Sequence, residues 1–192
     1  MPVAVVSILA AVLLGVGDLL LQRSLPYPWA NLANSSAVWA VLAFTIGYWV
    51  RTPWWRAAGA GVVLLVLAVP SYYVAATLIQ DDDLSNVWSA TSLLWMFFGL
   101  VAGALFGAAG SWARTSGWRR LVGIALPGAV LFAEAILLFS SRRATAVIEL
   151  VLGVTVILVV GRGIRQRLGA LALAVPLGLL GFAAFLVGGF SR

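Results

Sequence analysis

Three carboxylic acids lie inside long apolar stretches of this sequence: Asp18, Glu134 and Glu149. A charged side chain in the middle of a bilayer costs roughly 2.5 to 3.5 kcal/mol on insertion scales, so such residues usually pair, bind a ligand or take part in chemistry. Asp18 could pair with the nearby Arg23, and Glu149 with Arg142 or the arginine after it. Glu134 has only apolar neighbours along the chain, so it is the strongest candidate for a functional role.

Other polar and aromatic side chains recur at helical spacing near the same ends of neighbouring apolar stretches, so they can share a face with the acids. The candidate ligand-binding residues are Glu134, Asp18, Gln22, Asn31, Asn34, Tyr72, Tyr73, Thr77, Gln80, Trp88, Ser92, Trp95 and Glu149. Acids supply counter-charge, and each aromatic face attracts a cation by about 0.5 to 2 kcal/mol. The first hypothesis is therefore a protein that binds or transports a small cationic or aromatic solute.

A second hypothesis gives Glu134 and Asp18 a catalytic role. A protonated carboxylic acid beside aromatic rings could protonate an olefin or epoxide and stabilise the resulting cation. In this respect the chain resembles the small seven-span membrane terpene cyclases. It has no Cys, His or Lys, which excludes thiolate or imidazole metal sites, the common nucleophile systems and Schiff-base lysines. The sequence thus leans away from an enzyme and predicts no metal and no cofactor.

A third hypothesis rests on a stripe of small residues formed by Gly99, Gly103 and Gly107. Glycines at this spacing let two membrane helices approach closely. The pattern does not say whether the second helix belongs to this chain, to another copy or to a different membrane protein. The chain could therefore be a non-catalytic subunit that binds its partner through this stripe.

The composition places all these residues in a membrane. Of the 192 residues, 63% are hydrophobic and only 9% are charged, and the mean hydropathy is +1.08. The net charge of +6 comes from arginines that stand singly or in pairs between apolar stretches, a distribution that indicates membrane topology and no nucleic-acid partner. We expect a multi-pass protein whose main partner is the lipid bilayer, with residues 1–192 forming a single transmembrane domain.

Seven apolar stretches are long enough, at about 20 helical residues each, to cross the hydrocarbon core. They cover residues 3–21, 34–50, 57–79, 87–109, 121–139, 144–160 and 168–190. The stretches are continuous and do not alternate, which predicts an all-α helical bundle and no β-barrel. Because the second and sixth stretches are the shortest, a bundle of six spans with one re-entrant segment is the alternative.

The arginines predict the orientation. With seven spans, one side receives eight arginines and no acid, and the other receives Arg23, Arg142, Arg143 and Arg192. The positive-inside rule then places the N-terminus in the cytoplasm, and all six acids lie toward the outer side. The loop acids Asp81 to Asp83 could simply be solvated and precede a helix that begins at Ser85. Most tryptophans, including Trp39, are expected in the aromatic belts at the membrane surfaces.

Three stretches carry a resemblance to a known family: NLANSSAVW at 31–39, FGLVAGALFG at 98–107, and the segment from GWRR at 117–120 to FAE at 132–134. They look like an uncharacterised bacterial family of small integral-membrane proteins. The resemblance implies a multi-pass protein of the bacterial cytoplasmic membrane and no particular activity. In size, and in the loop that could cover an outward pocket, the chain is also similar to the substrate-binding S components of energy-coupling-factor transporters.

Overall fold

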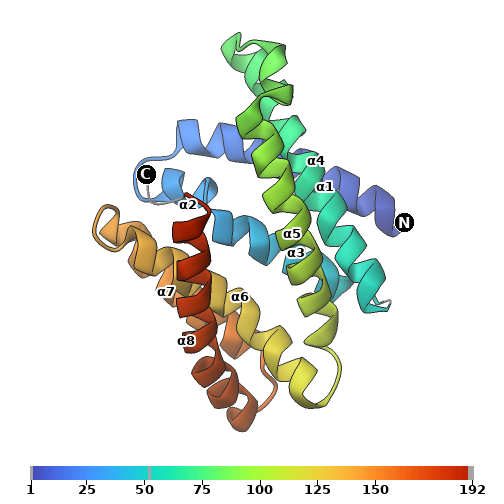
Figure 1. Ribbon diagram of the computed structural model, residues 1–192, viewed down its shortest axis with the longest axis vertical. Coiled ribbons are helices and arrows are strands. Elements are labelled where there is room, and N and C mark those ends of the chain that lie inside the picture. The colour runs from blue at the N-terminus through green and yellow to red at the C-terminus, as the bar shows by residue number, and fades with distance from the viewer. Residues whose placement is uncertain (1, 52, 190–192) are drawn as a thin grey trace.

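The computed structural model describes residues 2–51 and 53–189, and within these ranges every regular element is a helix. The elements are α1 (Val3–Ser24), α2 (Trp29–Ala33), α3 (Ser36–Trp49), α4 (Trp54–Gln80), the 3-10 helix η1 (Leu84–Trp88), α5 (Ala90–Trp112), α6 (Gly117–Leu138), α7 (Arg143–Val160) and α8 (Ile164–Val187) (Figure 1). The prediction of an all-α fold is confirmed.

Six of the described helices, α1 and α4 to α8, are long and apolar enough to cross a membrane. The chain is therefore a multi-pass membrane protein. The seventh apolar stretch forms α3, which has only 14 residues. At 1.5 Å per residue this helix is about 21 Å long, less than the ~30 Å of the hydrocarbon core. The sequence prediction of seven spans, with six as the alternative, corresponds to six long helices and one short one.

Several helices extend past the predicted ends of the apolar stretches. The helix predicted at 57–79 begins at Trp54, directly after Pro53, and the one predicted at 121–139 begins at Gly117. Arg and Trp side chains can reach the membrane surface from inside a helix, so the change in polarity does not mark the helix end. The predicted end of the last stretch at Phe190 lies outside the described residues.

The loop before α5 differs from its prediction. Asp83, and not Ser85, is the N-cap of η1, because its side chain accepts a hydrogen bond of 2.8 Å from the Ser85 backbone N–H. This hydrogen bond stabilises the carboxylate and lowers the pKa of Asp83. The helix predicted to start at 87 starts at Ala90, because the Ser89 hydroxyl accepts from the Ser92 N–H and caps α5 there.

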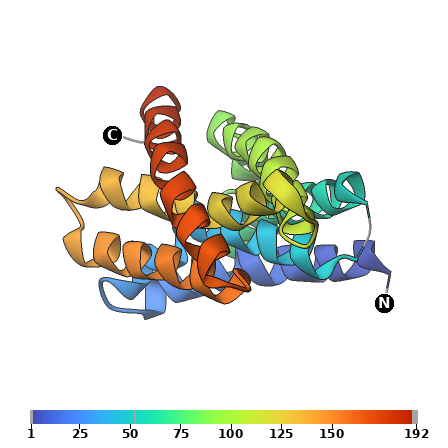
Figure 2. The same ribbon diagram turned by 90° about the horizontal axis from the view of Figure 1, so that it is seen from below.

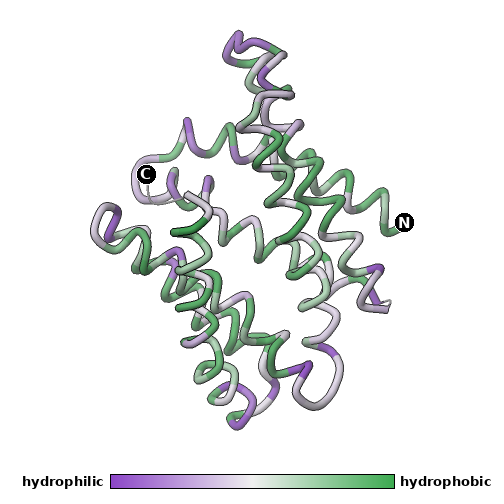
Figure 3. The backbone as a smooth tube through the Cα atoms, viewed as in Figure 1, coloured by the Kyte–Doolittle hydropathy of each residue, from purple (hydrophilic) through white to green (hydrophobic). Residues whose placement is uncertain are grey.

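Successive apolar helices alternate in direction. In Figure 1 the N-terminal end of α1 and the α3–α4, α5–α6 and α7–α8 connections lie along the right and the bottom of the view, and the other connections lie along the top and the left. Figure 3 shows hydrophilic segments at these two ends and hydrophobic helices between them. The arrangement separates the arginine-rich connections from the connections near the acids, as the sequence pattern predicts.

The glycine stripe of α5 packs against helices of the same chain. A Cβ atom added at Gly103 would lie 2.6 Å from the Gly61 carbonyl oxygen of α4, and Gly107 meets the backbone of Ala57 and Gly47 equally closely. Small residues at these positions let the α3, α4 and α5 backbones touch. Because α4 and α3 occupy this face, it does not offer a surface to a second protein.

Two helices stand apart on one face of the bundle. Figures 1 and 2 both show α5 and α8 side by side with a gap between them, and the two helices make almost no direct contact. Helices α3 and α6 lie behind the gap, where α3 packs against α5 and α6 packs against α8. This arrangement positions the cavity described below.

Candidate ligand cleft

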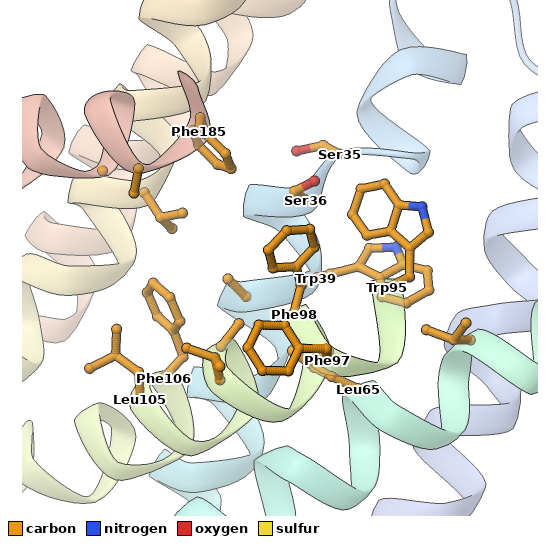
Figure 4. Close-up of a pocket in the computed structure, with 18 of the residues that line it drawn as sticks. Ser35, Ser36, Trp39, Leu65, Trp95, Phe97, Phe98, Leu105, Phe106 and Phe185 are labelled. Atoms are coloured by element: carbon orange, nitrogen blue, oxygen red, sulfur yellow. The ribbon is translucent and has the colours of Figure 1, made fainter. Parts of the chain in front are cut away.

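A cavity of about 830 Å³ lies between α5 and α8. Its lining comes from α3, α4, α5, α6 and α8, together with Asp18 of α1 and with Asn34 and Ser35, which directly precede α3. In Figure 4, Ser35 and Ser36 lie at one end, Leu105 and Phe106 at the other, and the rings of Trp39, Trp95, Phe97 and Phe98 lie between them. Small-molecule sites typically have this size, a largely apolar wall and a few polar groups.

The cavity opens sideways between the helices and not only at their ends. Val101 on α5 and Leu180 on α8 line it, yet they are 50% and 68% exposed. Phe97, also on the rim, is 59% exposed. Because α5 and α8 are membrane-spanning helices, an opening between their middle sections faces lipid. We call this cavity the lateral cleft.

Asp18 is the acid that lines the lateral cleft. Its side chain is only 4% exposed, and its Oδ1 atom has no hydrogen-bond partner in residues 2–51 and 53–189. The indole of Trp39 lies beside the same carboxyl group, close enough for an attractive contact. Buried polar atoms are nearly always hydrogen-bonded, so an unpartnered carboxylate oxygen in a cavity wall needs an explanation.

Aromatic and hydroxyl groups also line the part of the lateral cleft that contains Asp18, which we call its polar end. Gln22 Nε2 donates a hydrogen bond of 2.7 Å to the Tyr72 hydroxyl, which leaves the Tyr72 hydrogen able to donate elsewhere. Tyr72 and Tyr73 pack edge to face with ring centroids 5.4 Å apart. Trp95 stacks in the same manner on Phe98, with centroids 6.1 Å apart. The polar end thus combines one acid with several aromatic faces.

The predicted ligand-binding residues fall into two groups. Five of them line the lateral cleft: Asp18, Asn34, Tyr72, Tyr73 and Trp95. The others do not line it: Gln22, Asn31, Thr77, Gln80, Trp88, Ser92, Glu134 and Glu149. Gln22 contacts the cleft residue Tyr72, whereas the Thr77 hydroxyl bonds to the backbone of its own helix and Trp88 is 73% exposed.

Glu134 has a structural partner on another helix. Its Oε2 atom accepts hydrogen bonds from the Ser35 hydroxyl at 3.1 Å and from the Ala37 backbone N–H at 2.5 Å. These donors belong to the N-terminal turn of α3, where backbone N–H groups lack partners within the helix and attract negative charge. The carboxylate therefore caps α3 from α6, behind the wall of the cleft.

The opposite end of α3 is held by a cation. Arg114 Nη1 donates a hydrogen bond of 2.8 Å to the carbonyl oxygen of Tyr48, in the last turn of the helix, and the guanidinium lies 5.7 Å from the centre of the Tyr48 ring. Carbonyl groups at a helix C-terminus attract positive charge. Short as it is, α3 therefore has protein partners at both ends.

Glu149 is fully buried, and neither of its oxygens has a hydrogen-bond partner in the described part of the chain. The pairing with Arg142 or Arg143 that the sequence allowed is therefore not formed. Glu149 lies close enough to Glu134 for direct electrostatic coupling. The Ser35 hydroxyl also faces Glu149, but it makes no hydrogen bond of good geometry to either oxygen.

The sequence interpretation missed several residues of the cleft. Trp39 was assigned to the aromatic belt, yet it packs against the core and lines the cavity. Its place in the first turn of a short apolar helix gave only a weak signal for this role. Phe97, Phe98 and Phe185 were not singled out because aromatic residues in membrane helices resemble ordinary lipid-facing or core positions.

The sequence matches a family described as "Family of unknown function (DUF6518)" over residues 1–188, and the chain belongs to this family. No curated protein and no solved structure shows a match to the chain.

Proposed function

We propose that this member of the family binds an amphipathic organic cation in the lateral cleft, with Asp18 as the counter-charge. The observation that carries the proposal is the unpartnered Asp18 Oδ1 atom in the wall of a cavity of about 830 Å³. An ammonium group in the cleft beside this carboxyl group would neutralise a charge that is otherwise costly in the membrane.

The distribution of polarity along the cleft supports an amphipathic ligand. Asp18, Tyr72 and Trp95 line the cleft and lie toward the ends of α1, α4 and α5 that join the α1–α2 and α4–α5 connections. Leu105 and Phe106 lie at the other end of the cleft (Figure 4). A cationic head would lie among the aromatic rings, which attract positive charge, and an aliphatic or aromatic body would extend between α5 and α8. The opening between these helices would let such a molecule enter from the bilayer.

The polar end faces the side of the membrane that the arginine distribution assigns to the outside. Asp18 and Trp95 lie near the helix ends that join the acid-bearing connections, away from the arginine-rich ones. We infer that the N-terminus is cytoplasmic and that the head of the ligand sits in the outer half of a cytoplasmic membrane.

A matched series of three compounds tests the proposal: 4-phenylbutylammonium, 4-phenylbutanol and 5-phenylpentanoate. They share one apolar body and differ in the charge of the head. The thermal unfolding midpoint of the purified protein in lipid nanodiscs should rise with the ammonium compound, because a ligand that binds the folded state stabilises it. The alcohol should shift the midpoint less, and the carboxylate should not shift it.

The variant Asp18→Asn should remove the preference for the cation while leaving the fold intact, because asparagine keeps the size of the side chain. Asp83→Asn is the matched control, since Asp83 is a loop acid away from the cleft. Equal shifts for the three compounds, or an ammonium shift that survives in Asp18→Asn, would show that Asp18 does not anchor a cation.

A carboxyl group in an aromatic-lined cavity also fits the cyclase hypothesis. In that case Asp18, and not Glu134, would be the general acid, because Glu134 caps α3 and does not line the cleft. A membrane preparation that converts a prenylated olefin or epoxide into cyclic products, with Asp18→Asn inactive, would favour this function over simple binding.

A further inference from the structure

A second buried polar cluster lies behind the cleft, where α6 and α7 meet the start of α3. It contains Glu149 and Thr145 of α7, Glu134 of α6 and Ser35, the N-cap of α3. All four side chains are buried, and Thr145 precedes Glu149 by four residues, so the two share one face of α7. We call this group the α7 cluster.

The cluster contains three buried oxygen atoms without hydrogen-bond partners among the described residues: Thr145 Oγ1 and both oxygens of Glu149. Other threonines in the membrane helices donate to the backbone carbonyl four residues earlier, as Thr45 does to Val41 and Thr155 does to Val151. Thr145 is 0% exposed and makes no such bond, because it lies in the first turn of α7 and the residue four positions earlier, Ser141, precedes the helix. Its hydroxyl is therefore an observation independent of the two acids.

The charges in the cluster are unequal. The negative charge of Glu134 is offset by the N–H groups of the α3 N-terminus and by electrostatic attraction to Arg142. Glu149 has no such partner, and its proximity to Glu134 adds repulsion. Two carboxylates in a water-poor site cannot both stay uncompensated. The arrangement thus lacks about one positive charge, located at Glu149.

We propose that the α7 cluster binds one sodium ion, held by the Glu149 carboxylate and the Thr145 hydroxyl, with Glu134 and Ser35 completing an oxygen-lined site. Hard cations select oxygen ligands of this kind. A metal ion contacts several oxygens at once, so it would satisfy both Glu149 oxygens and Thr145 together, whereas one proton would pair with fewer of them. The single missing charge favours a monovalent ion over a divalent one.

Sodium binding to the purified protein in nanodiscs tests this site directly, with ²²Na⁺ as the probe and choline chloride keeping the ionic strength constant. We expect saturable binding of one ion per chain. Glu149→Gln should abolish it, and Thr145→Val should weaken it by roughly tenfold or more, as loss of a ligand-site contact commonly does. Thr155→Val is the matched control on the same helix and should bind as the unchanged protein does.

Both test variants remove charge or polarity from a buried site without changing its size much, so they should fold. Thermal unfolding in choline chloride checks this for each variant. The proposal is overturned if no saturable ²²Na⁺ binding occurs, or if binding persists in Glu149→Gln. It is also overturned if sodium leaves the unfolding midpoint unchanged while acidification raises it in the unchanged protein only, because a proton then occupies Glu149. None of these readouts depends on the ligand proposed for the cleft.

Discussion

The Glu134 carboxylate and the Arg114 guanidinium bind opposite ends of one short helix. Glu134 accepts from the Ala37 N–H at the start of α3, and Arg114 donates to the Tyr48 carbonyl near its end. A helix of 14 residues is too short to place both ends in water across a bilayer. Unpaired backbone groups within the membrane are costly, so the two charged side chains allow α3 to lie inside the bundle.

Glu134→Gln should destabilise the protein by about 1 to 3 kcal/mol. Glutamine can still accept one hydrogen bond, but it loses the charge-assisted bond and the favourable interaction with the helix N-terminus. Unfolding in mixed micelles with increasing dodecyl sulfate measures the change. Asp83→Asn, which alters an exposed loop acid, serves as the control and should change stability little. Unaltered stability of Glu134→Gln would contradict the capping role.

Arg114→Ala should cost about 1 to 2 kcal/mol, because the last turn of α3 loses its hydrogen bond and its compensating positive charge. Arg119→Ala is a suitable comparison, because the Arg119 guanidinium lies 5.7 Å from the centre of the exposed Trp118 ring. The same unfolding assay applies to both variants. If the two substitutions have equal effects, Arg114 does not act through α3.

Much of the fold could be predicted because its main signal is local. Continuous apolar stretches of about 20 residues identify membrane helices without knowledge of their neighbours. The sequence left open whether the second stretch, α3, was a full span or a shorter segment, because its length depends on capping by Ser35 and on distant partners such as Glu134 and Arg114. Helix pairing depends on side-chain fit between distant segments, which a single sequence does not encode in a readable pattern.

The candidate site was harder to predict for the same reason. Polar residues at helical spacing predicted that Asp18, Tyr72 and Trp95 could share a cavity, and the structure places them in the lateral cleft. Glu134 was ranked first because it lacked a partner along its own helix. Its partner is the backbone of α3, separated by 97 residues from it in the sequence, and no local pattern reveals such a contact.

Close packing of α4 and α5 predicts a sharp contrast between two glycines. Gly103→Ala should destabilise the protein by about 1 to 3 kcal/mol, because the added methyl group would overlap the Gly61 backbone. Gly59→Ala on α4 has no atom within 4 Å of the new group, and it should be neutral or stabilise by up to about 1 kcal/mol. Equal stability of the two variants would indicate that α4 and α5 do not approach so closely.

The proposed orientation can be tested by labelling, because the natural sequence contains no cysteine. Thr115 lies in an arginine-rich connection and Asp82 lies in the acidic one. Both positions are exposed, so we choose the variants Thr115→Cys and Asp82→Cys. A thiol reagent that does not cross membranes should label Asp82→Cys in intact cells and Thr115→Cys only after the cells are permeabilised. The reverse pattern would place the N-terminus outside and the polar end of the cleft on the cytoplasmic side.

Filling the lateral cleft should block ligand binding without unfolding the protein. Val101 lines the cleft and is 50% exposed, so Val101→Trp can place its ring in the opening without compressing the core. Loss of about 1.4 kcal/mol of binding energy corresponds to a tenfold weaker affinity, and we expect at least that effect on 4-phenylbutylammonium in the nanodisc assay.

Val151→Trp on α7 adds the same ring at a 59% exposed position away from the cleft, and this control variant should bind normally. Because Val101 is an apolar residue of α5 and Asp18 belongs to α1, reduced binding in the Val101→Trp variant would locate the body of the ligand between α5 and α8, separately from the head at Asp18. Undiminished binding would place the ligand elsewhere on the protein.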